Sequence, residues 1–314
     1  MKGKAYFKSL VYIMSKSEGK KKFQFKGERT KSTIIIIAVL VVFLALVIIN
    51  FVPGYTFILA AVSAIATSEL IKAVGAKNKI LLAVSCAVSF FSICAVGFKI
   101  EIPNVTVYLS FYVLFLLFLS VMFNKTIKYI DSVMAFFASV ALPYAFSCIL
   151  RLNDLSSINP HFTRWEETFF VGIGFACSWV TDSGAFIIGR KLGKHKMTPN
   201  ISPKKSVEGA IGGTVVAAIF NVVLMFIFQC IAKKYGHEVF ISASNSKYLA
   251  IIPISCVLSV VSMFGDLAAS VLKRNVGIKD YSNLLPGHGG IMDRFDSIVF
   301  VLPVLYGISV LIFS

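Results

Sequence analysis

The sequence predicts an all-α polytopic membrane protein with about nine transmembrane helices and a cytosolic N-terminus. Of its 314 residues, 57% are hydrophobic and 15% are charged, against about 25% charged in an ordinary soluble domain. Its mean hydropathy is strongly positive. One soluble core could not bury that apolar excess, so the chain is expected to sit in a bilayer.

Nine apolar runs approach the roughly 20 residues that a helix needs to cross a bilayer. They are residues 34–52, 54–74, 79–98, 104–123, 131–150, 168–190, 209–232, 248–272 and 295–313. The first run is too long for a signal-peptide core and lacks a small-residue cleavage site, so it is interpreted as an uncleaved anchor.

The basic residues orient these helices. With the N-terminus in the cytosol, 25 of the 31 Lys and Arg residues fall in cytosolic segments. Positive charge is retained on the cytosolic side of membranes, so the reverse orientation is disfavoured. Topology therefore accounts for the net charge of +16, and no nucleic-acid partner is needed.

The spans divide the chain into three predicted regions. These are a basic cytosolic segment at 1–33, a five-helix transmembrane region at 34–150, and a C-terminal transmembrane region at 168–314 with cytosolic loops 190–208 and 273–294. The basic segment is interpreted as a tail that sets topology. Contact with anionic headgroups is the alternative.

Acidic residues inside the spans are the main functional signal, because a central Asp costs about 2.5–3.5 kcal/mol on insertion scales. Asp182 and Asp266 each precede the cytosolic end of a span. At 1.5 Å per residue both lie roughly 9–12 Å below the inner surface. Asp293 and Asp296 stand at the start of the last span with the i, i+3 spacing of one helix face.

Four carboxylates at one depth would repel each other unless a cation neutralised them. Mg²⁺ suits this role because it takes one or two carboxylates together with substrate oxygens. Interhelix ion pairs with nearby Lys and Arg residues are the structural alternative. Glu69, also near an inner helix end, is interpreted as a surface ion pair with Lys72.

Two cytosolic loops supply the opposite charge. Loop 190–208 carries six basic residues and a Ser-Pro-Lys-Lys-Ser core, and lysines with hydroxyls before a helix start are typical of a phosphate site. Positive-inside charge alone is the simpler reading. The second loop has Lys273, Arg274 and Lys279, then a Pro-Gly turn, His288 and a Gly pair that lets backbone approach a ligand.

The stretch "SVLKRNVGIKDYSNLLPGHGGIMDRFDS" (270–297) resembles the C-terminal signature of phosphatidate cytidylyltransferases, also called CDP-diglyceride synthases. "DSGAFIIGRKLGKHK" and "ISPKKSVEG" resemble two further blocks of that family, and the likeness covers about 168–313. The chain departs from the family in "GDLAAS", where Ala269 stands in the place of a common Glu. That departure puts an essential role for the Glu in doubt.

The resemblance implies a Mg²⁺-dependent reaction of CTP with phosphatidic acid, which yields CDP-diacylglycerol and pyrophosphate in phospholipid biosynthesis. It implies catalytic roles for Asp182, Asp266, Asp293 and Asp296, with Asp266 and Asp293, then Asp182, as metal ligands and with room for a second cation. The implied phosphate and nucleotide contacts are Ser202, Lys204, Lys205, Ser206, Ser270, Lys273, Arg274, Lys279, His288, Gly289, Gly290 and Arg294. The enzyme would sit in the cell membrane among lipids, with its site facing the cytosol, and a homodimer is left open.

Two other functions remain open from the residues. A CTP-dependent polyprenol or lipid kinase would transfer the γ-phosphate and release CDP instead of pyrophosphate. A cation-coupled transporter would also use intramembrane acids, but transporters tend to show paired halves with broken helices. Here the acids are concentrated in one half of the chain and near one leaflet. A CDP-alcohol phosphotransferase is disfavoured, because its D-x-x-D-G-x-x-A-R run is missing.

Overall fold

The computed structural model describes residues 33–34, 37–160, 162–199, 201–237, 246–287 and 289–313. Within these ranges the chain is almost entirely helical, with a single pair of short strands. Nearly all of the basic segment predicted at 1–33 lies outside the described residues, and so does His288.

The helices and strands follow one another in an order that matches the predicted runs. After a helical segment at Ile37–Ile48 come α2 (Val52–Ala73), α3 (Lys79–Gly97), α4 (Val105–Met122), α5 (Tyr129–Leu152), the 3₁₀ turn η1 (Leu155–Ser157), α6 (Arg164–Leu192), β1 (Lys196–Thr198), β2 (Ser202–Ser206), α7 (Val207–Lys234), α8 (Ser246–Asn275), α9 (Met292–Phe295) and α10 (Ile298–Phe313).

Seven described helices are long and apolar enough to cross a membrane, namely α2 to α7 and the Ala250–Asn275 part of α8. The first and last predicted runs give the shorter apolar helices Ile37–Ile48 and Ile298–Leu311. The last predicted run, 295–313, is shortened at its start, because Met292–Phe295 forms a separate turn of helix and α10 begins only at Ile298. A multi-pass membrane protein is therefore supported, while the count of nine spans stays a prediction.

Local sequence signals start several of these helices. The Asn78 side chain accepts hydrogen bonds from the backbone N–H groups of Ile80 and Leu81 at the start of α3. Thr163 and Glu166 form a reciprocal capping box at the start of α6. Ser206 accepts a bond from Gly209 N at 3.2 Å and so caps α7. These caps satisfy N–H groups that have no partner within the helix.

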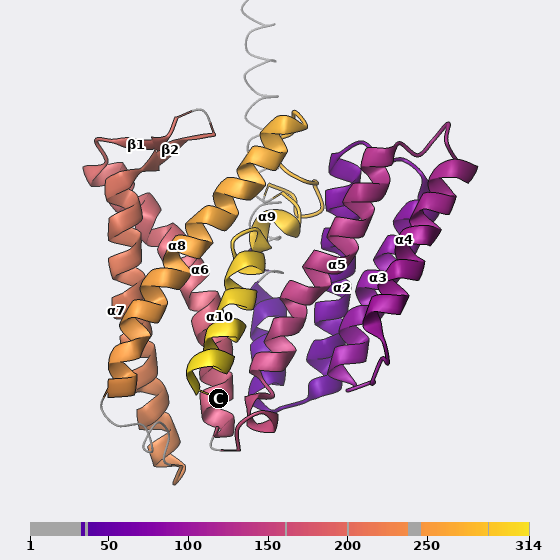
Figure 1. Ribbon diagram of the computed structural model, residues 1–314. Coiled ribbons are helices and arrows are strands. Elements are labelled where there is room, and N and C mark those ends of the chain that lie inside the picture. The colour runs from indigo at the N-terminus through magenta and orange to yellow at the C-terminus, as the bar shows by residue number, and fades with distance from the viewer. Residues whose placement is uncertain are drawn as a thin grey trace, which may run out of the picture.

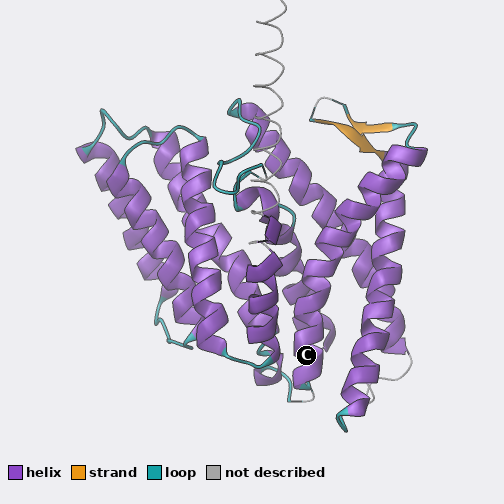
Figure 2. Cartoon of the chain, turned by 180° about the vertical axis from the view of Figure 1, so that it is seen from behind, coloured by secondary structure: helices purple, strands orange, loops and turns teal. Residues whose placement is uncertain are grey.

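The helices form two groups that meet along α5 and α10. In the first group α2, α3 and α5 pack together, and α4 lies against α5. In the second group α6 packs along α7, and both contact α8 (Figure 1). Helix α10 contacts α5, α6 and α8 between the two groups. The view from behind places the β1–β2 hairpin at the end of the bundle away from the C-terminus (Figure 2).

Glycines bring α6 and α7 into close contact. A Cβ atom added to Gly213 would lie 2.6 Å from the Thr181 carbonyl oxygen, and one added to Gly209 would lie 2.7 Å from the Ala185 carbonyl oxygen. Small residues allow such backbone approach between membrane helices, where dispersion contacts stabilise association. This close contact between α6 and α7 places the hairpin that precedes α7 beside the half of α6 that carries Asp182.

We expect Gly213→Ala to destabilise the fold by about 1–3 kcal/mol, the usual cost of overpacking. Gly172→Ala is the matched control, because its added Cβ would meet only Leu224, at 3.8 Å. That variant should be neutral or slightly stabilising, since Ala favours helix over Gly. Thermal unfolding of both purified variants in detergent checks this. Equal unfolding temperatures for the two variants would contradict the packing argument.

Candidate active site

Four carboxylates from four segments lie at the end of the bundle that carries the hairpin. Asp182 comes from α6, Asp266 from α8, Asp293 from α9, and Asp296 from the turn before α10 (Figure 1). The Ser297 hydroxyl links two of these acids, since its oxygen lies 3.2 Å from Asp182 Oδ2 and 3.4 Å from Asp296 Oδ1. The charge of Asp266 acts on both Asp182 and Asp296.

Lys205 brings positive charge to this cluster from β2. Its ammonium group forms an ion pair with Asp266, and both side chains are mostly buried. The start of α7 holds the residues that precede β1, because the Glu208 carboxylate accepts hydrogen bonds from the backbone N–H groups of Lys194 and His195. The predicted loop 190–208 thus contains a short antiparallel ribbon, β1–β2. That ribbon projects one lysine of the Ser-Pro-Lys-Lys-Ser run onto an acid.

Lys273 supplies the second positive charge. It lies seven residues after Asp266 on α8, a spacing that puts both on one face of a helix. Its Nζ atom is 2.8 Å from Asp293 Oδ1 and 3.9 Å from Asp296 Oδ2. The same ammonium group stands 5.1 Å from the centre of the Tyr281 ring. The four carboxylates and these two lysines therefore form one network with an excess of negative charge.

Asp293 organises the Gly-rich loop that precedes it. While Oδ1 contacts Lys273, Oδ2 accepts hydrogen bonds from Tyr281 N at 2.8 Å and from Gly290 N at 2.9 Å. Gly289 has φ +81°, and a Cβ atom there would meet Asp293 Oδ2 at 2.8 Å. The glycine is required by both the backbone conformation and the space. Asp293 is therefore the most fully hydrogen-bonded acid of the four.

Glu69 of α2 is a site residue that the sequence reasoning missed. Its interpretation as a surface ion pair with Lys72 is wrong, because the side chain is only 3% exposed. Its carboxylate accepts bonds from Ser282 Oγ at 2.6 Å, Ile291 N at 3.1 Å and Met292 N at 2.8 Å. An added Cβ at Gly290 would lie 2.5 Å from it. The available signal was the same as for Asp182, an acid within an apolar run.

The remaining predicted contacts surround this network at different depths. Arg274, Lys279, Arg294 and Lys204 are exposed, whereas Ser202 and Ser270 are partly buried and Ser206, Gly289 and Gly290 are buried. Ala269, which stands where the family often has Glu, is buried, and its carbonyl accepts a bond from Tyr281 OH at 3.3 Å. Burial raises the pKa of this Tyr281 hydroxyl, so it remains a donor. The exposed cations are placed to meet a ligand from the aqueous phase.

The side-chain chemistry of the cluster suits a divalent cation without forming a complete cage. In the described part of the chain no three His, Cys, Asp or Glu side chains are arranged to hold a metal ion. Mg²⁺ commonly needs only one or two carboxylates when substrate phosphates and waters complete its shell. Asp182, Asp266 and Asp296 present hard oxygen donors, of which Asp266 pairs with Lys205 and Asp296 lies 3.9 Å from Lys273, so the donors fit that ion.

Comparison with known proteins gives a consistent assignment. The model of the cytidylyltransferase family matches residues 28–312. The chain is similar to phosphatidate cytidylyltransferase of Bacillus subtilis (strain 168), with 34% identity over 279 residues, which cover 85% of this chain and 92% of the relative. Shorter matches of 143 residues reach 43% identity with the Staphylococcus saprophyticus protein and 41% with the Staphylococcus haemolyticus protein of the same name. Each covers 46% of this chain and 50% of the relative.

We expect Glu69→Gln to loosen the loop at 276–291, because the charge-assisted bonds to Ile291 N and Met292 N are replaced by weaker or mismatched ones. Amide hydrogen exchange in this loop should accelerate by about tenfold, while exchange in α3 and α7 stays unchanged. Glu101→Gln is the control, since Glu101 is exposed and at the other end of the bundle. If exchange in the loop were the same in both variants, Glu69 would not hold it.

Proposed function

Because the chain belongs to the cytidylyltransferase family, we propose that it is a membrane-embedded nucleotidyltransferase, a phosphatidate cytidylyltransferase. It would convert CTP and phosphatidic acid into CDP-diacylglycerol and pyrophosphate. The relative that bears this activity in its name aligns over 85% of the chain. The observation that carries the proposal is the meeting of carboxylates and lysines from α6, α8, α9 and β2 at one end of a membrane bundle.

The chemistry needs little proton transfer. A phosphate oxygen of phosphatidic acid, already ionised near neutral pH, attacks the α-phosphorus of CTP. The new P–O bond forms as the bond to the β-phosphate oxygen breaks, and pyrophosphate leaves with that electron pair. The barrier is mainly electrostatic, because an anionic lipid approaches a polyanionic nucleotide, so positioning and charge neutralisation supply most of the catalysis.

The lysines of the network are suited to that task. Lys205 contacts Asp266, and Lys273 contacts Asp293. A bound polyphosphate offers each ammonium group a more concentrated negative charge than one carboxylate does. The lysines would then stabilise the transferred phosphoryl group and the departing pyrophosphate, and the exposed Arg274, Lys279 and Lys204 would contact the nucleotide on its solvent side.

Mg²⁺ is the proposed cofactor, and Asp266, Asp182 and Asp296 would hold it. The charge of Asp266 acts on the other two carboxylates. When bound, such an ion neutralises phosphate oxygens and orients the attacked group. Asp293 already accepts three bonds from Lys273, Tyr281 and Gly290. Its first contribution is therefore to hold the Gly-rich loop and Lys273, and it would complete the metal shell only after those contacts rearrange.

The site is proposed to face the cytosol from the cell membrane. With the N-terminus inside, 25 of the 31 Lys and Arg residues are cytosolic, as the positive-inside rule expects. Helix α9, which carries Asp293, lies toward the same end of the bundle as the basic hairpin and the loop after α8 (Figure 1). Lipid tails can stay among the helices there while CTP arrives from water.

Purified protein supplied with phosphatidic acid, Mg²⁺ and CTP labelled at the α-phosphate should transfer label into the lipid fraction and release pyrophosphate in equal amount. Label at the γ-phosphate should appear in pyrophosphate. Transfer of γ-label to lipid with release of CDP would instead identify a lipid kinase. Cation flux into sealed proteoliposomes without CTP would identify a transporter.

We expect Asp266→Asn to lower product formation by about 100-fold or more, the range seen when a group that stabilises transition-state charge is removed. Asp154→Asn is the control, because Asp154 also pairs with a lysine but lies at the opposite end of the bundle. Rates measured across Mg²⁺ concentrations, with thermal unfolding of each variant, separate catalysis from stability. A folded Asp266→Asn protein with the wild-type rate would refute the assignment of this acid.

A further inference from the structure

A cavity lies at the end of the bundle opposite the carboxylate network. Its volume is about 980 Å³, and it is lined where α3 and α5 end and α6 begins, with Tyr55 of α2, Leu109 of α4 and Tyr306 of α10 contributing. None of the acids or lysines of the candidate active site lines it. We propose that this cavity binds an anionic phospholipid, with its phosphate at Arg151 and an acyl chain along the apolar wall.

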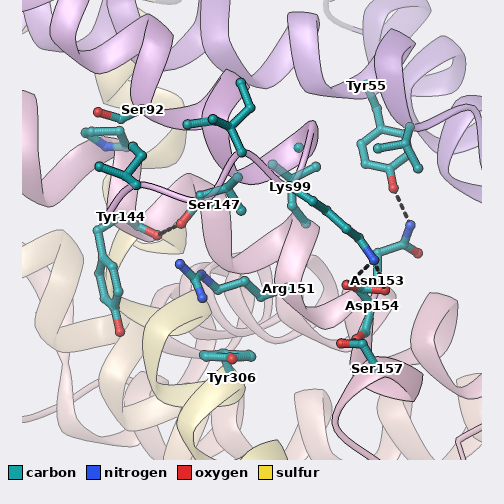
Figure 3. Close-up of a pocket in the computed structure, with 18 of the residues that line it drawn as sticks. Tyr55, Ser92, Lys99, Tyr144, Ser147, Arg151, Asn153, Asp154, Ser157 and Tyr306 are labelled. Atoms are coloured by element: carbon teal, nitrogen blue, oxygen red, sulfur yellow. Dashed lines mark hydrogen bonds and ion pairs between the residues drawn. The ribbon is translucent and has the colours of Figure 1, made fainter. Parts of the chain in front are cut away.

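Arg151 is the residue of the cavity that is expected to bind an anion. It stands in the last turn of α5, partly buried, with its guanidinium carbon 5.9 Å from the centre of the Tyr306 ring (Figure 3). Its Nε atom is buried and has no hydrogen-bond partner. Across the described residues no carboxylate forms an ion pair with it. A partly buried guanidinium without a counter-charge is costly, and its planar fork matches phosphate oxygens.

The neighbouring acids are already engaged with other cations. Asp154 Oδ2 lies 2.9 Å from Lys99 Nζ. Glu167 accepts bonds from Arg164 Nη1 at 3.1 Å and from Ser156 N at 2.7 Å. Glu101 also lines the cavity, but it is exposed to solvent. The positive charge of Arg151 is thus left for a ligand. Figure 3 shows its side chain near those of Tyr144 and Tyr306.

The shape of the cavity favours a lipid over a soluble anion. Beyond Arg151 its lining continues along α3 and α5 toward the middle of the bundle through Val88, Val96, Val140 and Pro143. These apolar walls offer nothing to inorganic phosphate, whereas an acyl chain gains by packing against them. One charged end and one apolar arm match the two parts of a phospholipid. Because CTP takes no part, this inference does not depend on the proposed reaction.

The test uses the full chain, purified in detergent and mixed with equal amounts of dioleoyl phosphatidylglycerol and dioleoyl phosphatidylcholine. Native mass spectrometry then reports both the retained lipid and the oligomeric state. We expect the wild-type protein to retain phosphatidylglycerol in preference to phosphatidylcholine. Arg151→Gln should lower that retention by about tenfold. Ala95→Trp, which fills the cavity and leaves every charge in place, should lower it similarly.

Lys233→Gln is the matched control, because Lys233 is exposed at the same end of the bundle but does not line the cavity. It should retain lipid as the wild type does. Thermal unfolding shows which variants are folded, and Arg151→Lys, which keeps the charge, should regain part of the retention. Equal retention by wild type and Arg151→Gln, or no preference for the anionic lipid, would overturn the proposal. Loss of bound lipid in the presence of millimolar inorganic phosphate would also overturn it, because the site would then bind a soluble anion. A lipid-free dimer that dissociates on Arg151→Gln would overturn it as well, because a second copy of the chain would then occupy the cavity.

Discussion

Charge that is buried at the end of an apolar bundle must be paired, and this constraint shapes the structure around the candidate site. Asp182, Asp266, Asp293 and Asp296 would each be costly alone. Lys205 and Lys273 approach them from a hairpin and from the face of α8, yet two cations leave four acids undercompensated. The network therefore holds more negative than positive charge, which is the property that the proposed site for metal-bound phosphates needs.

The same constraint ties the two groups of helices together. Glu69 belongs to α2 of the first group, and it holds the backbone of the loop that precedes α9. Asp293 holds that loop from its other side and is itself held by Lys273. A change in the packing of α2 would thus reach Lys273 through two carboxylates. The five-helix region is in this sense part of the site and not only its membrane anchor.

Much of the fold and part of the site could be predicted from the sequence. Hydropathy located every long helix to within a few residues, and the rise per residue placed Asp182 and Asp266 at one depth. The prediction was less good at the ends. The helix predicted from residue 295 begins only at Ile298, because Met292–Phe295 forms a separate turn of helix, α9, that carries Asp293. Loop 190–208 forms two strands because its residues pair with one another and with the start of α7.

The sequence by itself determined that the chain is a multi-pass membrane protein and that residues 270–297 resemble a family signature. The first follows from hydropathy summed over neighbouring residues, and the second follows from the order of residues along the chain. Only the tertiary structure decided which charges meet. Glu69 finds its partners 213 and 223 positions away, at Ser282 and Met292, whereas Arg151 forms no ion pair within the described residues. Electrostatic pairing depends on distance in space, and local sequence patterns do not encode that distance.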